Sequence, residues 1–321
     1  MGIGHHALYQ SISHIRLRYK YLHGTHIIIP TPHHTTPHHM TTKPSYQEHE
    51  DYVSQLHHQL PAEWQFKHHP LYCHVLEHVD KDQGSQYLNQ IETQFPHISF
   101  VQMRDYVNVN DKYGGAVKHI FTTQSLRLLY CSASSLRYIY QALIVLEAYR
   151  HTDCTHMVEL GAGYGGLCLA IHMFAPIMLT TTITPIVYYM IDLPASCDLI
   201  RDYLALHASH LPFKQSYRVV EAKEAKEAKE AKAPLPFDPP PPKEHSFFIS
   251  HFCFSALSES YQAYYRREVI DACAHGMLTW QTCFGDQVEC IDSLIGKRVT
   301  KCVEEHPQTA PEHVKNYYVY F

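Results

Sequence analysis

The residues best suited to do chemistry lie in Met157–Gly166 (MVELGAGYGG), where an acidic side chain precedes four closely spaced glycines. Met157–Leu160 is predicted to be the end of a buried strand, and Leu167–Phe174 the helix that follows. Glycines let the backbone between them approach a ligand closely, and a helix start offers free N–H groups. This strand, turn and helix therefore predict a nucleotide-binding corner.

Two carboxylates indicate which nucleotide the corner holds. The glycine spacing matches G-x-G-x-x-G, which also binds NAD and FAD. Glu159, however, stands two residues before the first glycine, where its charge would repel a pyrophosphate and would suit a cofactor with sulfonium and ammonium groups. A second apolar stretch, Tyr188–Pro194 (YYMIDLP), contains Asp192, which can accept hydrogen bonds from both ribose hydroxyls. Both acids could instead cap neighbouring helices, but cofactor binding is the favoured interpretation.

Five segments in order resemble a family of sugar O-methyltransferases of the class I, S-adenosylmethionine-dependent type. They are Ser134–Glu147, Val158–Gly166, Tyr188–Leu204, Phe247–Leu257 and Tyr261–Gly276. The resemblance implies an α/β fold: a doubly wound, Rossmann-like, mostly parallel seven-stranded sheet whose last strand is antiparallel, preceded by a mainly helical N-terminal extension. It implies S-adenosylmethionine as the cofactor and a sugar hydroxyl, of a glycan or nucleotide sugar, as the methyl acceptor.

The cofactor-binding residues are expected at the ends of the first, second and fourth strands of that sheet. They are Glu159, Gly161, Gly163, Tyr164, Gly165, Asp192, Leu193 and Ser250.

A sugar hydroxyl is a weak nucleophile, so a general base is expected, and the resemblance places it near the ends of the fourth and fifth strands. His251 lies in the fourth strand's terminal stretch, where the family usually has Asn, and imidazole has a suitable intrinsic pKa. A packed strand histidine is an equally good interpretation. Glu259 and Asp286 are lesser candidates. The aspartate that would help to hold a divalent metal at the fourth strand's end is missing, so no metal is expected.

The chain divides into three parts by composition. Residues 1–44 are predicted to be an irregular His- and Pro-rich arm, for which metal binding is less favoured than a flexible polar arm. Residues 45–125 form a cap, substrate or dimerisation region, and residues 126–321 the methyltransferase domain. That domain carries a low-complexity insert at 221–245, with EAK repeats followed by a proline run, interpreted as an exposed appendage.

Hydrophobic periodicity predicts the remaining elements. In the N-terminal part, Tyr52, Leu56 and Leu60 mark one helix face, Leu71, Val75 and Val79 a second, and Phe100–Val109 a short strand. Ser132–Glu147 is predicted to be a helix capped by Ser132 or Ser134. Further strands and helices then alternate, with strands at Ser216–Val220, Phe247–Phe254 and Met277–Phe284, helices at Cys197–His207, Tyr261–Ala274 and Val288–Ile295, and a closing pair at Thr300–Val303 and Tyr317–Phe321.

Composition limits the partners and the compartment. The net charge of −5 and pI of about 6.6 give no basic excess for nucleic acid. Ten cysteines without a C-x-x-C pair favour a reduced, cytoplasmic setting. The uncharged run Phe174–Ile191 contains Pro176 and Pro185, so it is interpreted as helix end, loop and strand and not as a membrane span. A homodimer is one possible assembly.

Two other functions stay open at this point. An NAD-dependent oxidoreductase would share the glycine pattern, but would favour an apolar residue in place of Glu159. A catalytically silent methyltransferase-like binding scaffold is suggested by Ala256, which stands where the family usually has Glu, and by the long insert.

Overall fold

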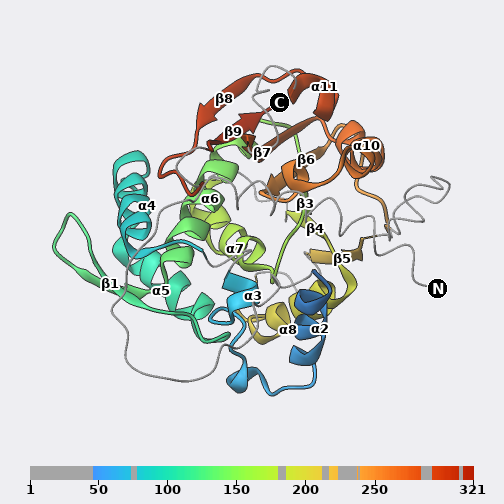
Figure 1. Cartoon of the computed structure of the whole chain (residues 1–321). Coiled ribbons are helices and arrows are strands. Elements are labelled where there is room, and N and C mark those ends of the chain that lie inside the picture. Colours follow the sequence, from blue (N-terminus) through green and yellow to red (C-terminus); the bar gives the residue numbers. More distant parts are fainter. Residues whose placement is uncertain are drawn as a thin grey trace, which may run out of the picture.

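A seven-stranded sheet of order β5-β4-β3-β6-β7-β9-β8 forms the centre of the molecule (Figure 1). The structure, a computed structural model, describes residues 46–73, 78–179, 186–211, 217–222, 237, 239–282, 291–310 and 314–321. The strands are β3 (His156–Leu160), β4 (Val187–Asp192), β5 (Tyr217–Glu221), β6 (Ser246–His251), β7 (His275–Gln281), β8 (Lys301–Glu304) and β9 (Asn316–Tyr320). The first five in spatial order are parallel, whereas β9 runs antiparallel to both β7 and β8. The expected mostly parallel, Rossmann-like fold is confirmed.

Helices cover both faces of this sheet because its strands carry apolar side chains on both sides. One core contains Met157 and Tyr188 and is covered by α6 (Ala133–Tyr149), α7 (Gly166–Met178) and α8 (Pro194–Leu206). The second core contains Val158 and Tyr189 and is covered by α10 (Glu259–Glu268) and α11 (Ile291–Ile295). Two short 3₁₀ turns, η2 (Phe254–Ala256) and η3 (Ile270–Ala272), flank α10. The cores meet the sheet from opposite sides, so the fold is doubly wound.

The N-terminal part is mainly helical, as expected, and packs against the first of these cores. Its elements are α2 (Tyr46–Leu56), η1 (Pro61–Glu63), α3 (Pro70–Cys73), α4 (Lys81–Gln94), α5 (Phe100–Asn110) and a hairpin of β1 (His119–Thr122) with β2 (Leu128–Cys131). Helix α4 lies along α6, and the hairpin projects to one side of the molecule (Figure 1).

One expectation for this part is wrong and two hold only in part. Phe100–Val109 is helix α5 and not a strand, because Ser99 and Gln102 form a capping box and Met103, Tyr106 and Val107 are buried at helical spacing. The helix face drawn through Leu60 ends at Leu56, and Leu60 is 67% exposed. The second predicted helix covers only Pro70–Cys73 within the described residues, and Val79 precedes α4.

Most elements of the sheet domain match the expectations to within a few residues. Ser132 caps α6 by accepting from the backbone N–H of Ser135 at 3.1 Å. Strand β6 ends at His251 and not at Phe254, because Phe252 adopts a left-handed backbone with φ +64°. The arm at 1–44, most of the insert at 221–245 and Asp286 lie outside the described residues. Among the helices that are described, none has the length and apolar character to cross a membrane.

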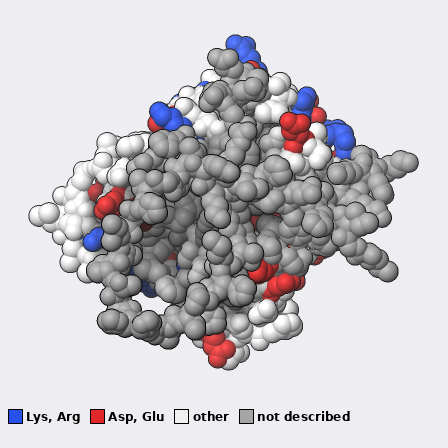
Figure 2. All heavy atoms as spheres, in the orientation of Figure 1, with Lys and Arg blue, Asp and Glu red and all other residues white. Residues whose placement is uncertain are grey.

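On the face seen in Figure 2, the described Lys and Arg side chains are scattered and lie near acidic ones.

Candidate active site

The candidate active site lies where the parallel strands β3, β4, β6 and β7 end. Register brings Glu159 opposite Met190 and Ile249, and His251 opposite Thr279. Because the carboxyl ends of parallel strands share one edge of the sheet, Glu159, Asp192, Ser250 and His251 converge there. We call this the carboxyl edge.

The glycine turn after β3 needs glycine for two separate reasons. Gly161, Gly163 and Gly165 have left-handed φ values of +82°, +64° and +87°, a region that other residues enter only with strain. In addition, a Cβ at Gly161 would collide with the Cβ of Cys253, which follows β6. The glycine turn is therefore close-packed against the residues that follow β6.

Glu159 is deeply buried beneath this turn. Its side chain accepts a hydrogen bond from the Tyr188 hydroxyl at 3.0 Å. Burial raises the pKa of Glu159 to about 8, the nearby Asp192 charge adds to this, and the Tyr188 hydrogen bond opposes it. The group is thus neutral at pH 7 in the ligand-free chain, and a cation beside it would favour the ionised form.

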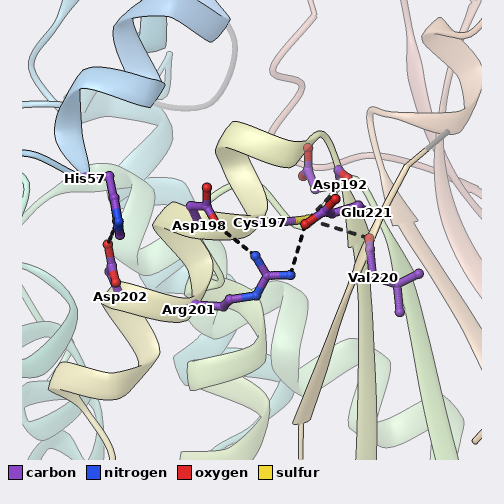
Figure 3. A network of polar contacts seen from close by, with 8 residues as sticks. All are labelled: His57, Asp192, Cys197, Asp198, Arg201, Asp202, Val220 and Glu221. Carbon is purple, nitrogen blue, oxygen red and sulfur yellow. Dashed lines mark hydrogen bonds and ion pairs between the residues drawn. The ribbon is translucent and has the colours of Figure 1, made fainter. Parts of the chain in front are cut away.

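Asp192 ends β4 and is tied to the backbone on both sides. Its Oδ2 accepts from the Gly163 N–H at 2.7 Å and its Oδ1 from the Leu193 N–H at 2.8 Å. Burial of the carboxyl group raises the pKa of Asp192 to about 6, while these N–H donors lower it. Behind it, the Cys197 thiol donates to the Asp192 carbonyl at 3.2 Å (Figure 3).

Glu221 ends the neighbouring strand β5 and differs from Asp192 in its surroundings. The two are register partners, but Glu221 is exposed and meets Arg201, which also contacts Asp198 (Figure 3). A carboxylate at a strand end is thus not enough to place it at the site.

Ser250 fixes the exit of β6. Its hydroxyl donates to the Leu160 carbonyl at 3.0 Å and accepts from the Phe254 N–H at 3.0 Å. This hydrogen-bond pair ties the end of β3 to the turn after β6. Both hydrogen bonds of the Ser250 hydroxyl are to backbone groups. The expected contact of Ser250 with the cofactor stays a prediction.

His251 and Thr279 form the second half of the site. The Nδ1 atom of His251 lies 2.7 Å from Oγ1 of Thr279, with the donor set by the tautomer. The Nε2 atom is buried and has no hydrogen-bond partner among the described residues. Burial of the ring, helped by the positive charge of Arg137, lowers the pKa of His251 to about 3. The imidazole is therefore neutral throughout the physiological range.

Arg137 brings the N-terminal part of the chain to this half. It is 2% exposed, and its guanidinium lies 5.6 Å from the Phe252 ring centre and 3.4 Å from the Nε2 of His78. His78 itself packs edge-on against Phe252 at 6.0 Å. Residues from three distant parts of the sequence thus meet behind His251.

The other predicted residues are placed differently. Tyr164 is buried, with its ring 4.4 Å from the Nζ of Lys67 and 5.0 Å from the Tyr203 ring. The same ring packs against Gly166, where it leaves no room for a Cβ. Leu193 precedes α8 directly. Glu259 is exposed in the first turn of α10. Within the described residues, no group of three His, Cys, Asp or Glu side chains could hold a metal ion.

Sequence reasoning missed Tyr188, Thr279 and Cys253. Each acts through a partner on a neighbouring strand, and strand register is not visible in the sequence. A polar residue inside an apolar strand, such as Thr279 in MLTWQ, was the one available signal.

The strand order and the antiparallel insertion of β9 between β7 and β8 define a class I methyltransferase-like fold. No family model and no curated protein matches the chain. Among solved structures, a candidate O-methyltransferase from Nostoc punctiforme overlaps 59% of this chain and 58% of its own, at 8% identity and a TM-score of 0.38. The magnesium protoporphyrin IX methyltransferase of Synechocystis, solved with bound S-adenosylmethionine, overlaps 57% of this chain and 77% of its own, at 8% and 0.38. The mitomycin 7-O-methyltransferase overlaps 59% and 55%, at 12% and 0.35.

Proposed function

We propose that this chain is an S-adenosylmethionine-dependent O-methyltransferase that acts on a sugar hydroxyl of a glycan or nucleotide sugar. The observation that carries the cofactor is the pair of acids, Glu159 and Asp192, which end adjacent parallel strands on either side of a left-handed glycine turn. One acid suits a cationic group and the other a ribose diol.

The residues present fit this cofactor. The oxygens of Asp192 accept from the Gly163 and Leu193 N–H groups, and Ser196 and Ala162 also hydrogen-bond the carboxyl group. A ribose diol would share or replace some of these donors. Glu159 gains from a cation nearby, because ionisation then no longer leaves a lone buried charge. When bound, the cofactor supplies an electrophilic methyl group.

His251 is proposed to receive the acceptor's proton at Nε2. With a pKa of about 3 it is a weak base, so it first orients the hydroxyl as a hydrogen-bond acceptor. It takes the proton only as the oxygen is alkylated and becomes strongly acidic. Arg137 disfavours earlier protonation of the ring. The N-terminal region at 45–125 is proposed to cap this side of the site, which is supported by the contact of His78 with Phe252.

Isothermal calorimetry tests the cofactor. The chain should bind S-adenosylmethionine and its demethylated product but not NAD. Asp192→Ala should weaken binding by about 1.5–3 kcal/mol, the usual worth of charge-assisted hydrogen bonds. Glu221→Ala, at the end of the next strand, is the matched control and should bind like the native protein. Binding of NAD alone would instead indicate an oxidoreductase.

Transfer of labelled methyl to a panel of free sugars, glycans and nucleotide sugars tests the acceptor. The choice of a sugar depends on the five-segment sequence resemblance, so this assay is independent of the cofactor test. Cofactor binding without transfer to any acceptor, in protein that is folded by circular dichroism, would favour the silent scaffold.

A further inference from the structure

Thr279 is the nearest polar group to the proposed base, and it comes from a different strand. It sits opposite His251 in the parallel register of β6 and β7 and is fully buried. Its Oγ1 lies 2.7 Å from Nδ1. The ring therefore has a hydrogen-bond partner at Nδ1, whereas Nε2 is buried without one among the described residues.

This geometry points to Thr279 as a positioning residue: we propose that its hydroxyl oxygen accepts from Nδ1–H and keeps Nε2 as a bare proton acceptor. The inference rests on the proposed function for what Nε2 receives, namely the proton of the methyl-accepting hydroxyl. It does not rest on that function for the tautomer itself.

Hydrogen-bond accounting supports this assignment. A neutral imidazole carries one hydrogen, so a hydrogen on Nδ1 leaves a lone pair on Nε2. In the opposite tautomer, Nε2 would bear a buried N–H without an acceptor, and orphaned buried N–H groups are rare.

Proton uptake at Nε2 strengthens the case for a hydroxyl at position 279. The resulting imidazolium has two donors, and Nδ1–H must then find an acceptor inside a buried site. The Thr279 oxygen supplies that acceptor both before and after the proton arrives. Val, which has nearly the same shape, could not.

A merely structural role is the competing explanation, in which the bond only joins two strands. Stability alone would not separate the two, because both predict some loss when the hydroxyl is removed. The tautomer of His251 and the rescue by Ser separate them, since packing does not depend on which nitrogen carries hydrogen.

The test is long-range ¹H–¹⁵N correlation NMR of the full chain labelled at histidine, with the His251 signals assigned by their loss in His251→Asn. Native protein and Thr279→Ser should show hydrogen on Nδ1 and a bare Nε2, and Thr279→Val should shift hydrogen to Nε2. Thr123→Val removes another buried threonine hydroxyl, in the β1–β2 hairpin, and should leave the His251 signals unchanged.

Turnover gives the second readout. With a working acceptor, Thr279→Val should lower methyl transfer by about 10²-fold, the lower end of a general base's share, with native affinity for S-adenosylmethionine. Thr279→Ser should restore most of the rate. Hydrogen on Nε2 in native protein, or the native tautomer in Thr279→Val, would overturn the inference even if Val is poorly stable. Failure to find any acceptor would overturn the proposed function and leave the tautomer result standing.

Discussion

Burial shifts pKa values in opposite directions at the two halves of the carboxyl edge, one at the ends of β3 and β4 and the other at the ends of β6 and β7. Under β3 and β4, burial raises the pKa values of Glu159 and Asp192 to about 8 and 6. At the ends of β6 and β7, burial and Arg137 lower the pKa of His251 to about 3. Desolvation penalises charge in either case, so both halves are driven toward neutrality.

The difference lies in which charge each half would accept. A cation entering the first half meets acids that ionise in response, whereas the second half already holds the buried charge of Arg137 and resists another proton. If the proposed function is right, one edge would attract a cationic cofactor beside a base that stays neutral. The predictions below test this contrast, from the largest expected effect to the smallest.

Replacing the proposed base should give the largest effect. His251→Asn keeps a polar side chain but cannot take a proton, so turnover should fall by about 10²–10⁴-fold with cofactor affinity little changed. Because the pKa of His251 is about 3, the native rate at saturating S-adenosylmethionine should not decline near pH 6.5, the usual pKa of histidine. Steady-state kinetics across pH 5–8 check both points. A normal rate in His251→Asn would remove the base from this half.

Filling the glycine turn after β3 with a side chain should weaken cofactor binding. Gly163→Val should weaken S-adenosylmethionine binding by about 10²-fold or more, because strain at φ +64°, about 1–3 kcal/mol, adds to the space the side chain fills. Gly296→Val is the control for backbone strain, since Gly296 has φ +66° and follows α11, although its side chain would also displace that of Arg266. Calorimetry on protein shown to be folded would reject the idea if both variants bound normally.

The sequence predicted this contrast only in part. The apolar stretches around Glu159, Asp192 and His251 place all three on strands, and the alternation of strands and helices brings those strand ends together. Helix α5 was mistaken for a strand because FVQMRDYVNV fits both periods, and its capping box at Ser99 was overlooked. The Thr279 contact could not be predicted, because it depends on a register between strands 28 residues apart in sequence.

Proton linkage at Glu159 sharpens the comparison further. If a cation binds the ionised acid, affinity for S-adenosylmethionine should fall as the pH drops below about 8, by up to about tenfold per pH unit. Glu159→Gln should bind more weakly at pH 8 and lose most of this slope. A native affinity that is flat between pH 6 and 8.5 would show that the acid does not sense the ligand.

Stability should carry the same linkage with the opposite sign. The folded pKa of Glu159, about 8, lies above its ordinary value of 4.5, so the folded state binds more protons between these limits. The contribution of Glu159 to the free energy of unfolding of the ligand-free chain should therefore decrease as the pH rises from 4.5 to 8. Denaturant titrations of native protein and Glu159→Gln isolate it, and identical pH slopes would contradict the buried, neutral acid.

The smallest effect is expected at the insert that leaves the acidic half after β5. Its EAK repeats offer no apolar side chains at core spacing. Its end is different, because Phe237 packs edge-on against the Tyr189 ring at 5.6 Å and the Tyr189 hydroxyl donates to the Pro239 carbonyl at 2.9 Å. Replacing residues 223–236 by a Gly/Ser linker should leave the melting temperature and turnover nearly unchanged.

Phe237→Ala tests whether the end of the insert packs on the domain. The ring is only partly buried, so its loss should cost less than the roughly 3–5 kcal/mol of a fully buried Phe. A lower melting temperature with native cofactor affinity is expected, since Tyr189 belongs to the core of α10 and α11, whereas Glu159 is hydrogen-bonded to Tyr188 of the other core. If the Gly/Ser linker variant were less stable than Phe237→Ala, the repeats would have to contribute to the packing of the domain.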